Sequence, residues 1–334
     1  MTTRRDIIKS GAGLAAIIAA GRATAAIVRS MLGARNAAFV NKKEAPQSEY
    51  WGLCFTALDP SCSISMTKAG SSPPAVSLQY STNAINWETF TVGETVVNLT
   101  AGKCAWFKAT TTNSRFASST SSYNLFNITG RVSASGNIMS LLDGSNNDLK
   151  KFSSGNAFIN LFYGCSTLVE PPDLPATTAS NACYFNMFRG CTSLTRIAKM
   201  PSAISAGSYE IGRMMYAGCE SLMEVDMSGT TITTTNSYGM GSSLFRNCTS
   251  LRKIKPVLAT VGTLVFDNCS SIELVDFRHV TSVVSLANIN AFGNTNGTYK
   301  IVVPDSLYSS WTTATNWKDS SIVGHIVRAS DYTG

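Results

Sequence analysis

The sequence predicts a β-rich, multidomain protein in which a small β-sandwich is followed by a solenoid of short parallel strands joined by turns or short helices. Two observations lead to this fold class. An eight-residue phrase recurs five times in the second half, at steps of 26, 28, 29 and 21 residues, and such periods are typical of solenoids, whose units bury their apolar faces against their neighbours. Residues 49–130 instead contain short, closely spaced runs of β-forming residues, and a chain of 334 residues is long enough for two domains.

The N-terminal residues, 1–25, have the ordered parts of a targeting segment. TRRDIIK at 3–9 matches the twin-arginine export pattern, the uncharged stretch 10–21 is too short to span a bilayer, and the tripeptide Ala-Thr-Ala at 23–25 is a small-residue cleavage site. Residues 26–48 continue as an Ala-rich helical extension and a polar linker. Two alternatives to export remain open, namely a helix that docks the chain into a larger assembly and a plain surface helix.

The formal net charge of +7 comes from the N-terminal segment. Residues 1–43 hold eight Lys or Arg and one Asp, a net of +7, so the remaining 19 basic residues balance the remaining 19 acidic ones. A nucleic-acid-binding protein is expected to carry a basic patch or stripe on its folded body. The neutral body therefore argues against nucleic acid as a partner, and membrane contact is expected only through the targeting segment.

Residues 49–130 are expected to form the sandwich. Runs such as GLCFTAL, SCSISMT and CAWFKAT are separated by breaks that contain Pro, Gly or Asn, which is the pattern of short strands in an all-β module. The segment LQYSTNAINWETFTVGETVVNL at 78–99 resembles the immunoglobulin-like modules that precede repeats in bacterial and phage surface proteins. We expect Trp87 and Trp106 to anchor the core of this module rather than to stack on sugars.

Five of the nine cysteines occupy one position of the recurring phrase, which reads apolar, aromatic, any residue, Gly or Asn, Cys, polar, Ser or Thr, Leu or Ile. A thiol beside a buried ring fills a tapering core, so we expect a reduced structural ladder of Cys165, Cys191, Cys219, Cys248 and Cys269. A buried serine hydroxyl would be imperfectly paired there, so Cys219→Ser is expected to destabilise more than Cys219→Ala. Pairing of neighbouring ladder cysteines is the alternative, and Cys54 and Cys62 either stay free or pair across a hairpin.

The phrase resembles the BspA-like leucine-rich repeats of bacterial surface proteins, whose consensus is approximately F-x-x-C-x-x-L-x-x-I. Phe188, Cys191, Leu194 and Ile197 fit this spacing, as does the repeat at 245–254, and the repeats at 216–225 and 266–275 fit it with conservative exchanges. The first unit departs from it, because Pro171 stands at the Ile position. The ending KIVVPDSLYSSWTTATNW resembles the closing segment of that family. The expected parts are a solenoid cap at 131–156, five leucine-rich repeats within 157–299 and a C-terminal cap at 300–334.

Each Leu-x-x-Ile segment is expected to supply a short parallel strand, whose residues alternate between the core and the solvent. Val225 and Met227 then face the core, which forces Glu224 and Asp226 outward. The same register continues a row of charges that starts at Glu170, and its candidate ligand-binding residues on the concave strand face are Arg196, Glu224, Asp226, Lys253, Lys255, Asp276 and Arg278. A row of mixed sign fits a protein or glycan partner better than a polyanion. The alternative is that these charges only keep the edge soluble.

The sequence contains no recognisable catalytic or metal-binding pattern. His279 and His325 lack the His or Glu partners of a zinc site, DGSNND at 143–148 lacks the EF-hand spacing, and no phosphate loop or nucleophile elbow is found. We therefore expect a non-enzymatic protein without cofactors. The resemblance implies an exported protein at the cell surface or outside the cell, which recognises a host or cell-surface protein or glycan. The alternative is a phage virion fibre or receptor-binding protein attached by its N-terminal helix.

Overall fold

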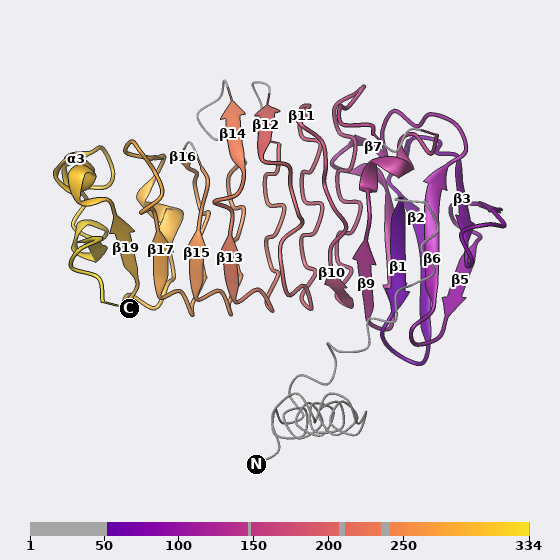
Figure 1. Cartoon of the computed structure of the whole chain (residues 1–334), viewed down its shortest axis with the longest axis horizontal. Helices are drawn as coiled ribbons and strands as arrows, with labels where there is room; N and C mark the ends of the chain where they lie inside the picture. Colours follow the sequence, from indigo (N-terminus) through magenta and orange to yellow (C-terminus); the bar gives the residue numbers. More distant parts are fainter. Residues whose placement is uncertain (1–51, 146–147, 207–210, 235–240, 259, 334) are drawn as a thin grey trace, which may run out of the picture. The chain divides into compact units, whose positions relative to one another are not determined.

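The computed structural model describes residues 52–145, 148–206, 211–234, 241–258 and 260–333. The expected targeting segment and the extension that follows it lie outside these residues. The described chain begins with two β-sheets and continues as coiled repeats that follow one another in sequence order (Figure 1). Among the described residues, no helix is both long and apolar enough to cross a bilayer.

Residues 53–135 form two β-sheets that pack against each other. The strands are β1 (Leu53–Ala57), β2 (Cys62–Ala69), β3 (Leu78–Ser81), β4 (Glu88–Phe90), β5 (Val96–Leu99), β6 (Cys104–Ala109), β7 (Ala117–Ser119), β8 (Ser122–Thr129) and β9 (Val132–Ser135). One sheet has the order β9-β1-β6-β3-β4 and the other β5-β2-β8-β7. The ring centroids of Phe55 and Phe107 in the first sheet lie 5.2 and 5.6 Å from that of Phe126 in the second. The resemblance to immunoglobulin-like modules stays a prediction.

The two tryptophans of this module do not anchor the core that the sheets share. Trp106 is buried, but strand alternation puts its neighbour Phe107 on the core side of β6. Trp87 is half-buried, and the Lys108 ammonium lies 3.9 Å from the centroid of its ring. The expectation of a core anchor was therefore wrong for Trp87, whereas Trp106 is buried but lies outside the shared core, which is filled by phenylalanines from both sheets.

Strand β9 joins the two-sheet module to the first repeat. It pairs antiparallel with β1 and parallel with β10 (Leu168–Glu170), so one sheet continues from the module into the repeats. From the other sheet, the Phe126 N–H donates to the Leu161 carbonyl at 2.9 Å. The 3-10 helix η1 (Ile138–Leu141) adds buried apolar side chains. The segment expected to be a separate cap at 131–156 is thus partly a strand of the module itself.

Each repeat contributes short strands to parallel rows. The first row, which after β10 consists of β13 (Glu224–Asp226), β15 (Lys253–Lys255), β17 (Leu274–Asp276), β19 (Lys300–Val303) and β20 (Ile326–Arg328), comes from the Leu-x-x-Ile segments and the chain that follows them. The segment 194–197 is an exception to the prediction, because it forms no strand. Val225 and Met227 are buried as predicted, with 4% and 2% of their surface exposed. Further strands, which the sequence did not indicate, are β11 (Thr178–Ala179), β12 (Ala203–Ala206), β14 (Thr231–Thr234), β16 (Thr260–Val261) and β18 (Ser285–Leu286).

The segments before the cysteines form successive turns rather than short helices. In the first repeat, alternate N–H groups donate to the next repeat, for example from Phe158 to the Cys183 carbonyl and from Phe162 to the Met187 carbonyl, both at 2.9 Å. Residues between them close turns within the repeat, as the Cys165 N–H does on the Phe162 carbonyl at 3.1 Å. The main chain on this side is therefore hydrogen-bonded both within and between repeats.

The stacking continues past residue 299. Strand β19 pairs with β17 and β20, and the Phe292 ring contacts that of Phe266 with centroids 5.3 Å apart. Trp311 and Trp317 are fully buried. The helical elements here are η2 (Ile289–Phe292), η3 (Asp305–Leu307), α3 (Tyr308–Thr313) and η4 (Val323–His325). The segment expected to act only as a C-terminal cap thus also extends the parallel sheet.

Candidate functional site

The recurring phrase builds two columns inside the repeats. The aromatic rings stack nearly parallel from repeat to repeat, as for Phe162 and Phe188, whose centroids are 5.4 Å apart with 3° between their planes. Each thiol donates to the carbonyl of the aromatic residue one rung earlier, with Sγ–O distances of 3.0 Å (Cys165–Phe126), 3.1 Å (Cys191–Phe162), 3.2 Å (Cys219–Phe188), 3.2 Å (Cys248–Tyr216) and 3.1 Å (Cys269–Phe245). Burial raises the pKa of all five thiols. These residues form a scaffold that holds the outer faces in register, and their reduced state stays a prediction.

The strand face is the first of these outer faces, and its charges are paired between neighbouring repeats. Strand register places Glu224 beside Lys253 and Asp226 beside Lys255, with N–O distances of 3.8 and 3.2 Å. Further pairs are Arg196–Glu170 at 3.5 Å and Arg252–Glu273 at 2.8 Å. Neighbouring strands lie about 4.8 Å apart, and like charges directly opposite each other would be destabilising there. The opposite signs therefore avoid like-charge repulsion between neighbouring strands, although exposed pairs of this kind add little to stability.

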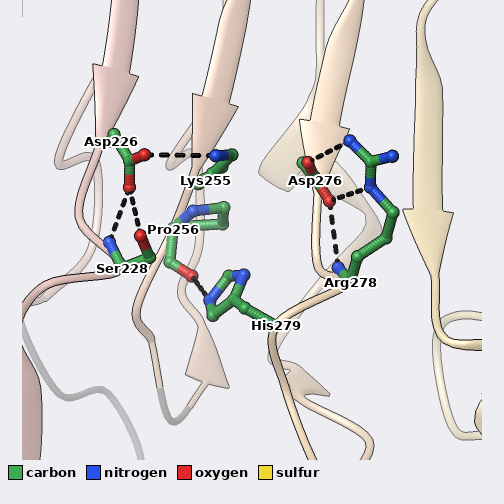
Figure 2. A network of polar contacts seen from close by, with 7 residues as sticks. All are labelled: Asp226, Ser228, Lys255, Pro256, Asp276, Arg278 and His279. Carbon is green, nitrogen blue, oxygen red and sulfur yellow. Dashed lines mark hydrogen bonds and ion pairs between the residues drawn. The ribbon is translucent and has the colours of Figure 1, made fainter. Parts of the chain in front are cut away.

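Asp226 sits at the end of β13 and is held from two sides (Figure 2). It accepts hydrogen bonds from the Ser228 hydroxyl and backbone N–H, and it also accepts one from the Lys255 ammonium. The Ser228 bonds and then Lys255 hold the pKa of this carboxyl below its usual range. Asp226 thus stays ionised and in a fixed orientation on an exposed strand end.

Asp276 lies on the same row but is buried, contrary to the expected outward exposure. Arg278, two residues later, folds back over it, with 2.7 Å from Nη2 to Oδ2 and 2.9 Å from Nε to Oδ1 (Figure 2). The Arg278 backbone N–H also donates to Oδ1 at 3.0 Å. Burial alone would raise the pKa of Asp276, but the Arg278 hydrogen bonds and charge lower it overall. This pair presents the guanidinium, rather than the carboxylate, to solvent.

Sequence reasoning missed one residue on this face. Met223 directly precedes Glu224 and has 55% of its surface exposed. The consensus assigns its position to a variable residue, so the pattern did not single it out. A signal was nevertheless present, because its counterparts in the neighbouring repeats are Thr195 and Arg252, and a large apolar residue among such neighbours stands out.

The two histidines and Cys62 make structural contacts within the fold. His279 Nε2 lies 3.1 Å from the Pro256 carbonyl oxygen (Figure 2), and the His325 ring stacks on Tyr299 with centroids 4.0 Å apart. Cys62 donates to the carbonyl of Arg131 and is not bonded to Cys54, which resolves the hairpin alternative in favour of free thiols. Within the described residues, no group of three or more His, Cys, Asp or Glu side chains could hold a metal ion.

Comparison with known families supports the expected repeat type over part of the chain. Residues 181–314 match the BspA type leucine rich repeat region in six copies. Over these residues the chain is similar to BspA-type leucine-rich repeats. The six copies lie within 181–314 and do not include the phrase at 161–168, and the five units expected within 157–299 stay a prediction. Searches of curated proteins and of solved structures found no match to the chain.

BspA-type repeats occur generally in surface or secreted proteins, and this repeat type typically serves binding or scaffolding rather than catalysis. The repeats place exposed charged residues on a regular strand platform and bury the aromatic, Cys and Leu or Ile positions of the recurring phrase. The arrangement is thus suited to non-covalent contact with a partner.

Proposed function

We propose that this protein is an exported, non-enzymatic recognition protein whose repeats contact a protein or glycan partner through the strand face. The observation that carries the proposal is the exposed side chain of Met223, which stands beside the ion pair of Glu224 and Lys253. Methionine is enriched at protein interfaces relative to the rest of the surface. Solvent-exposed ion pairs contribute little to stability, so the fold alone gives little reason for a charged platform around an exposed apolar residue.

The ion pairs themselves fit a recognition role. Paired side chains are already oriented, so a partner with complementary charges loses less entropy on binding than it would against free side chains. The acids and bases alternate along the face, and a partner is then selected by its charge pattern rather than by its net charge. Binding is expected to weaken with salt, because exposed charges are screened.

A charge swap tests this proposal without removing the ion pairs. The variant E224K/D226K/K253E/K255E keeps each cross-repeat pair but inverts the pattern, whereas E224K/D226K alone puts like charges opposite each other. We expect the purified swap variant and Met223→Gln to fold as the wild type does and to bind cultured host cells or a panel of matrix proteins and glycans at least tenfold more weakly by surface plasmon resonance. Lys68→Gln, an exposed position on β2 of the two-sheet module, is the control. Unchanged binding by both strand-face variants would place the site elsewhere.

Export is tested separately by mass spectrometry of the native N-terminus. Cleavage after Ala25 supports export, and an intact Met1 supports attachment to a particle such as a virion. Replacing Arg4 and Arg5 with Lys is expected to retain the precursor in the cytoplasm, because the twin-arginine pattern requires both residues. Normal export of that double variant would contradict the assignment.

A further inference from the structure

The turn side of the repeats contains a hollow of about 210 Å³ that no feature of the strand face explains. We call it the turn-side trough. Its lining includes Gly164, Gly190 and Gly218, one from each of three successive repeats, which we call the floor glycines, together with Arg189 and Arg246. Tyr163 and Met214 also line it.

The fold would permit side chains at the positions of the three floor glycines. The floor glycines have φ of 72°, 75° and 74°, and the equivalent Asn247 and Asn268 of the next two repeats adopt φ of 62° and 57°. The Asn268 amide donates to the Asn247 side-chain oxygen at 3.2 Å, so asparagine fits this column. A Cβ at Gly190 would meet nothing closer than 3.6 Å, and a Cβ at Gly164 would meet nothing within 4 Å. Left-handed backbone favours glycine but also accepts asparagine, so the turns do not require an open trough.

Arg189 gives the trough an uncompensated positive charge. Its guanidinium lies 5.7 Å from the ring centroid of Tyr163, and its Nη1 lies 3.7 Å from the Met214 sulfur. No carboxylate of the described residues forms an ion pair with it. Arg246 at the other end is already paired with Asp267, at 2.9 Å. Of the residues that line the trough, Arg189 would therefore contribute most to the binding of an anionic ligand.

The floor has no main-chain donor to offer a ligand. The Gly164, Gly190 and Gly218 N–H groups donate to carbonyls of the following repeat at 2.8, 2.8 and 2.7 Å. An extended peptide that docks by adding a strand needs free main-chain groups, and it finds no donors here. Recognition must come from side chains, namely a guanidinium, which binds carboxylates through paired hydrogen bonds, and the Tyr163 ring, which is 39% exposed.

We propose that the turn-side trough binds a carboxylate-bearing sugar residue of an acidic glycan. The Arg189 guanidinium takes the carboxylate, Tyr163 packs against an apolar face of the sugar ring, and the glycine floor leaves room for the ring itself. A hollow of about 210 Å³ is smaller than the roughly 300–1,000 Å³ of sites for drug-sized ligands, which limits the ligand to a single ring in the trough. This site is distinct from the strand face, so it adds to the proposed function.

The test uses two acidic probes, tetragalacturonate and 3′-sialyllactose, each compared by calorimetry with its neutral methyl ester. We expect the wild-type protein to bind at least one acid and to bind the ester of that acid at least tenfold more weakly. Arg189→Gln is expected to lose at least tenfold in affinity. Gly190→Asn is expected to lose as much while remaining folded, because asparagine occupies this column in two other repeats.

The controls separate this site from the strand face. The strand-face swap variant is expected to bind the acidic sugar as the wild type does, and its circular dichroism and that of Gly190→Asn show whether each is folded. Failure of both acids to bind, equal binding of acid and ester, or wild-type affinity of the folded trough variants would each overturn the proposal. Binding of a poly-glutamate peptide that is lost equally in Arg189→Gln, without sugar binding, would assign the trough to acidic peptides instead. All of these results leave the strand-face proposal standing.

Discussion

The thiol of Cys219 donates a hydrogen bond to the main-chain carbonyl oxygen of Phe188, 3.2 Å away in the preceding repeat. The same carbonyl accepts the backbone N–H of Cys191 at 3.1 Å. Each cysteine thus fills space beside the aromatic column and also ties its own repeat to the one before. Alanine would supply neither the volume nor the hydrogen-bond donor. A serine hydroxyl would supply the donor, but on a C–O bond that is shorter than the C–S bond of cysteine.

This contact reverses the expected ranking of substitutions at Cys219. Cys219→Ser keeps a donor for the Phe188 carbonyl, so we expect a loss of about 1 kcal/mol in the free energy of unfolding. Cys219→Ala removes the donor and leaves a small void, and we expect it to cost about 1–2 kcal/mol. Urea titration of both variants checks the order. A serine variant clearly less stable than the alanine variant would show that the hydroxyl finds no acceptor.

The buried Asp276 carboxylate makes stability depend on pH. Its pKa is lowered in the folded protein, so its contribution is present above the unfolded pKa of about 3.9 and is lost as pH falls through the folded value. We expect Asp276→Asn to cost about 1–2 kcal/mol at pH 7, after allowance for the partly exposed Arg278, and to flatten the change in stability between about pH 5 and pH 3.

Urea titrations of Asp276→Asn at pH 7, 5 and 3 check this, and Asp226→Asn is the matched control. Asp226 also has a lowered pKa, but its side chain is 55% exposed, so screening by solvent should leave a smaller effect. Equal effects of the two substitutions at every pH would mean that burial of Asp276 adds nothing to its pairing with Arg278.

The inward-facing residues of the first strand row could be predicted from the sequence because they repeat. Alternation fixes Val225 and Met227 as core residues once the strand is recognised. The other strands could not be recognised, since segments such as TITT and AISA carry small or polar residues and gain their strand conformation from pairing with the neighbouring repeat. The sequence did not reveal the role of β9 either, because its two pairing partners, β1 and β10, lie far from each other in the sequence.

The candidate strand face was predictable as a set of outward charges but not as a set of pairs. Alternating signs indicate a mixed surface, whereas the pairing of Lys255 with Asp226 depends on the register between repeats of unequal length. Arg278 could not be placed from alternation, because it follows the strand and turns back onto Asp276. The turn-side trough escaped the sequence reading altogether, since its glycines were read only as part of the repeated phrase.

Cys104 is expected to be the most reactive thiol among the described residues. It lies on β6 beside Thr56, with 3.3 Å between the hydroxyl and the sulfur. A hydrogen bond from the Cys54 thiol, aided by Thr56 and Lys103, lowers the pKa of Cys104 to about 6, while the pKa of Cys54 is raised. We therefore expect Cys104 to hold more of the nucleophilic thiolate form at neutral pH than an ordinary cysteine does.

Brief alkylation of the native protein with iodoacetamide, followed by peptide mapping, checks this expectation. We expect Cys104 to be labelled before the ladder cysteines, with a rate whose pH midpoint is about 6. Thr56→Val should raise that midpoint, because the thiolate loses a donor. A midpoint at or above that of an ordinary cysteine, about 8.5, would contradict the assignment.

Tyr216 breaks the phenylalanine pattern of the phrase for a structural reason. Its hydroxyl accepts a hydrogen bond from the Ala198 N–H at 3.0 Å, and both residues are buried. Tyr216→Phe leaves that N–H without an acceptor, which we expect to cost about 1–3 kcal/mol. Tyr184→Phe is the matched control, because the buried Tyr184 hydroxyl has no hydrogen-bond partner among the described residues, and its removal should be neutral or stabilising. Urea titration of the two variants side by side compares these losses, and equal stability of both would show that the Ala198 contact contributes nothing to the fold.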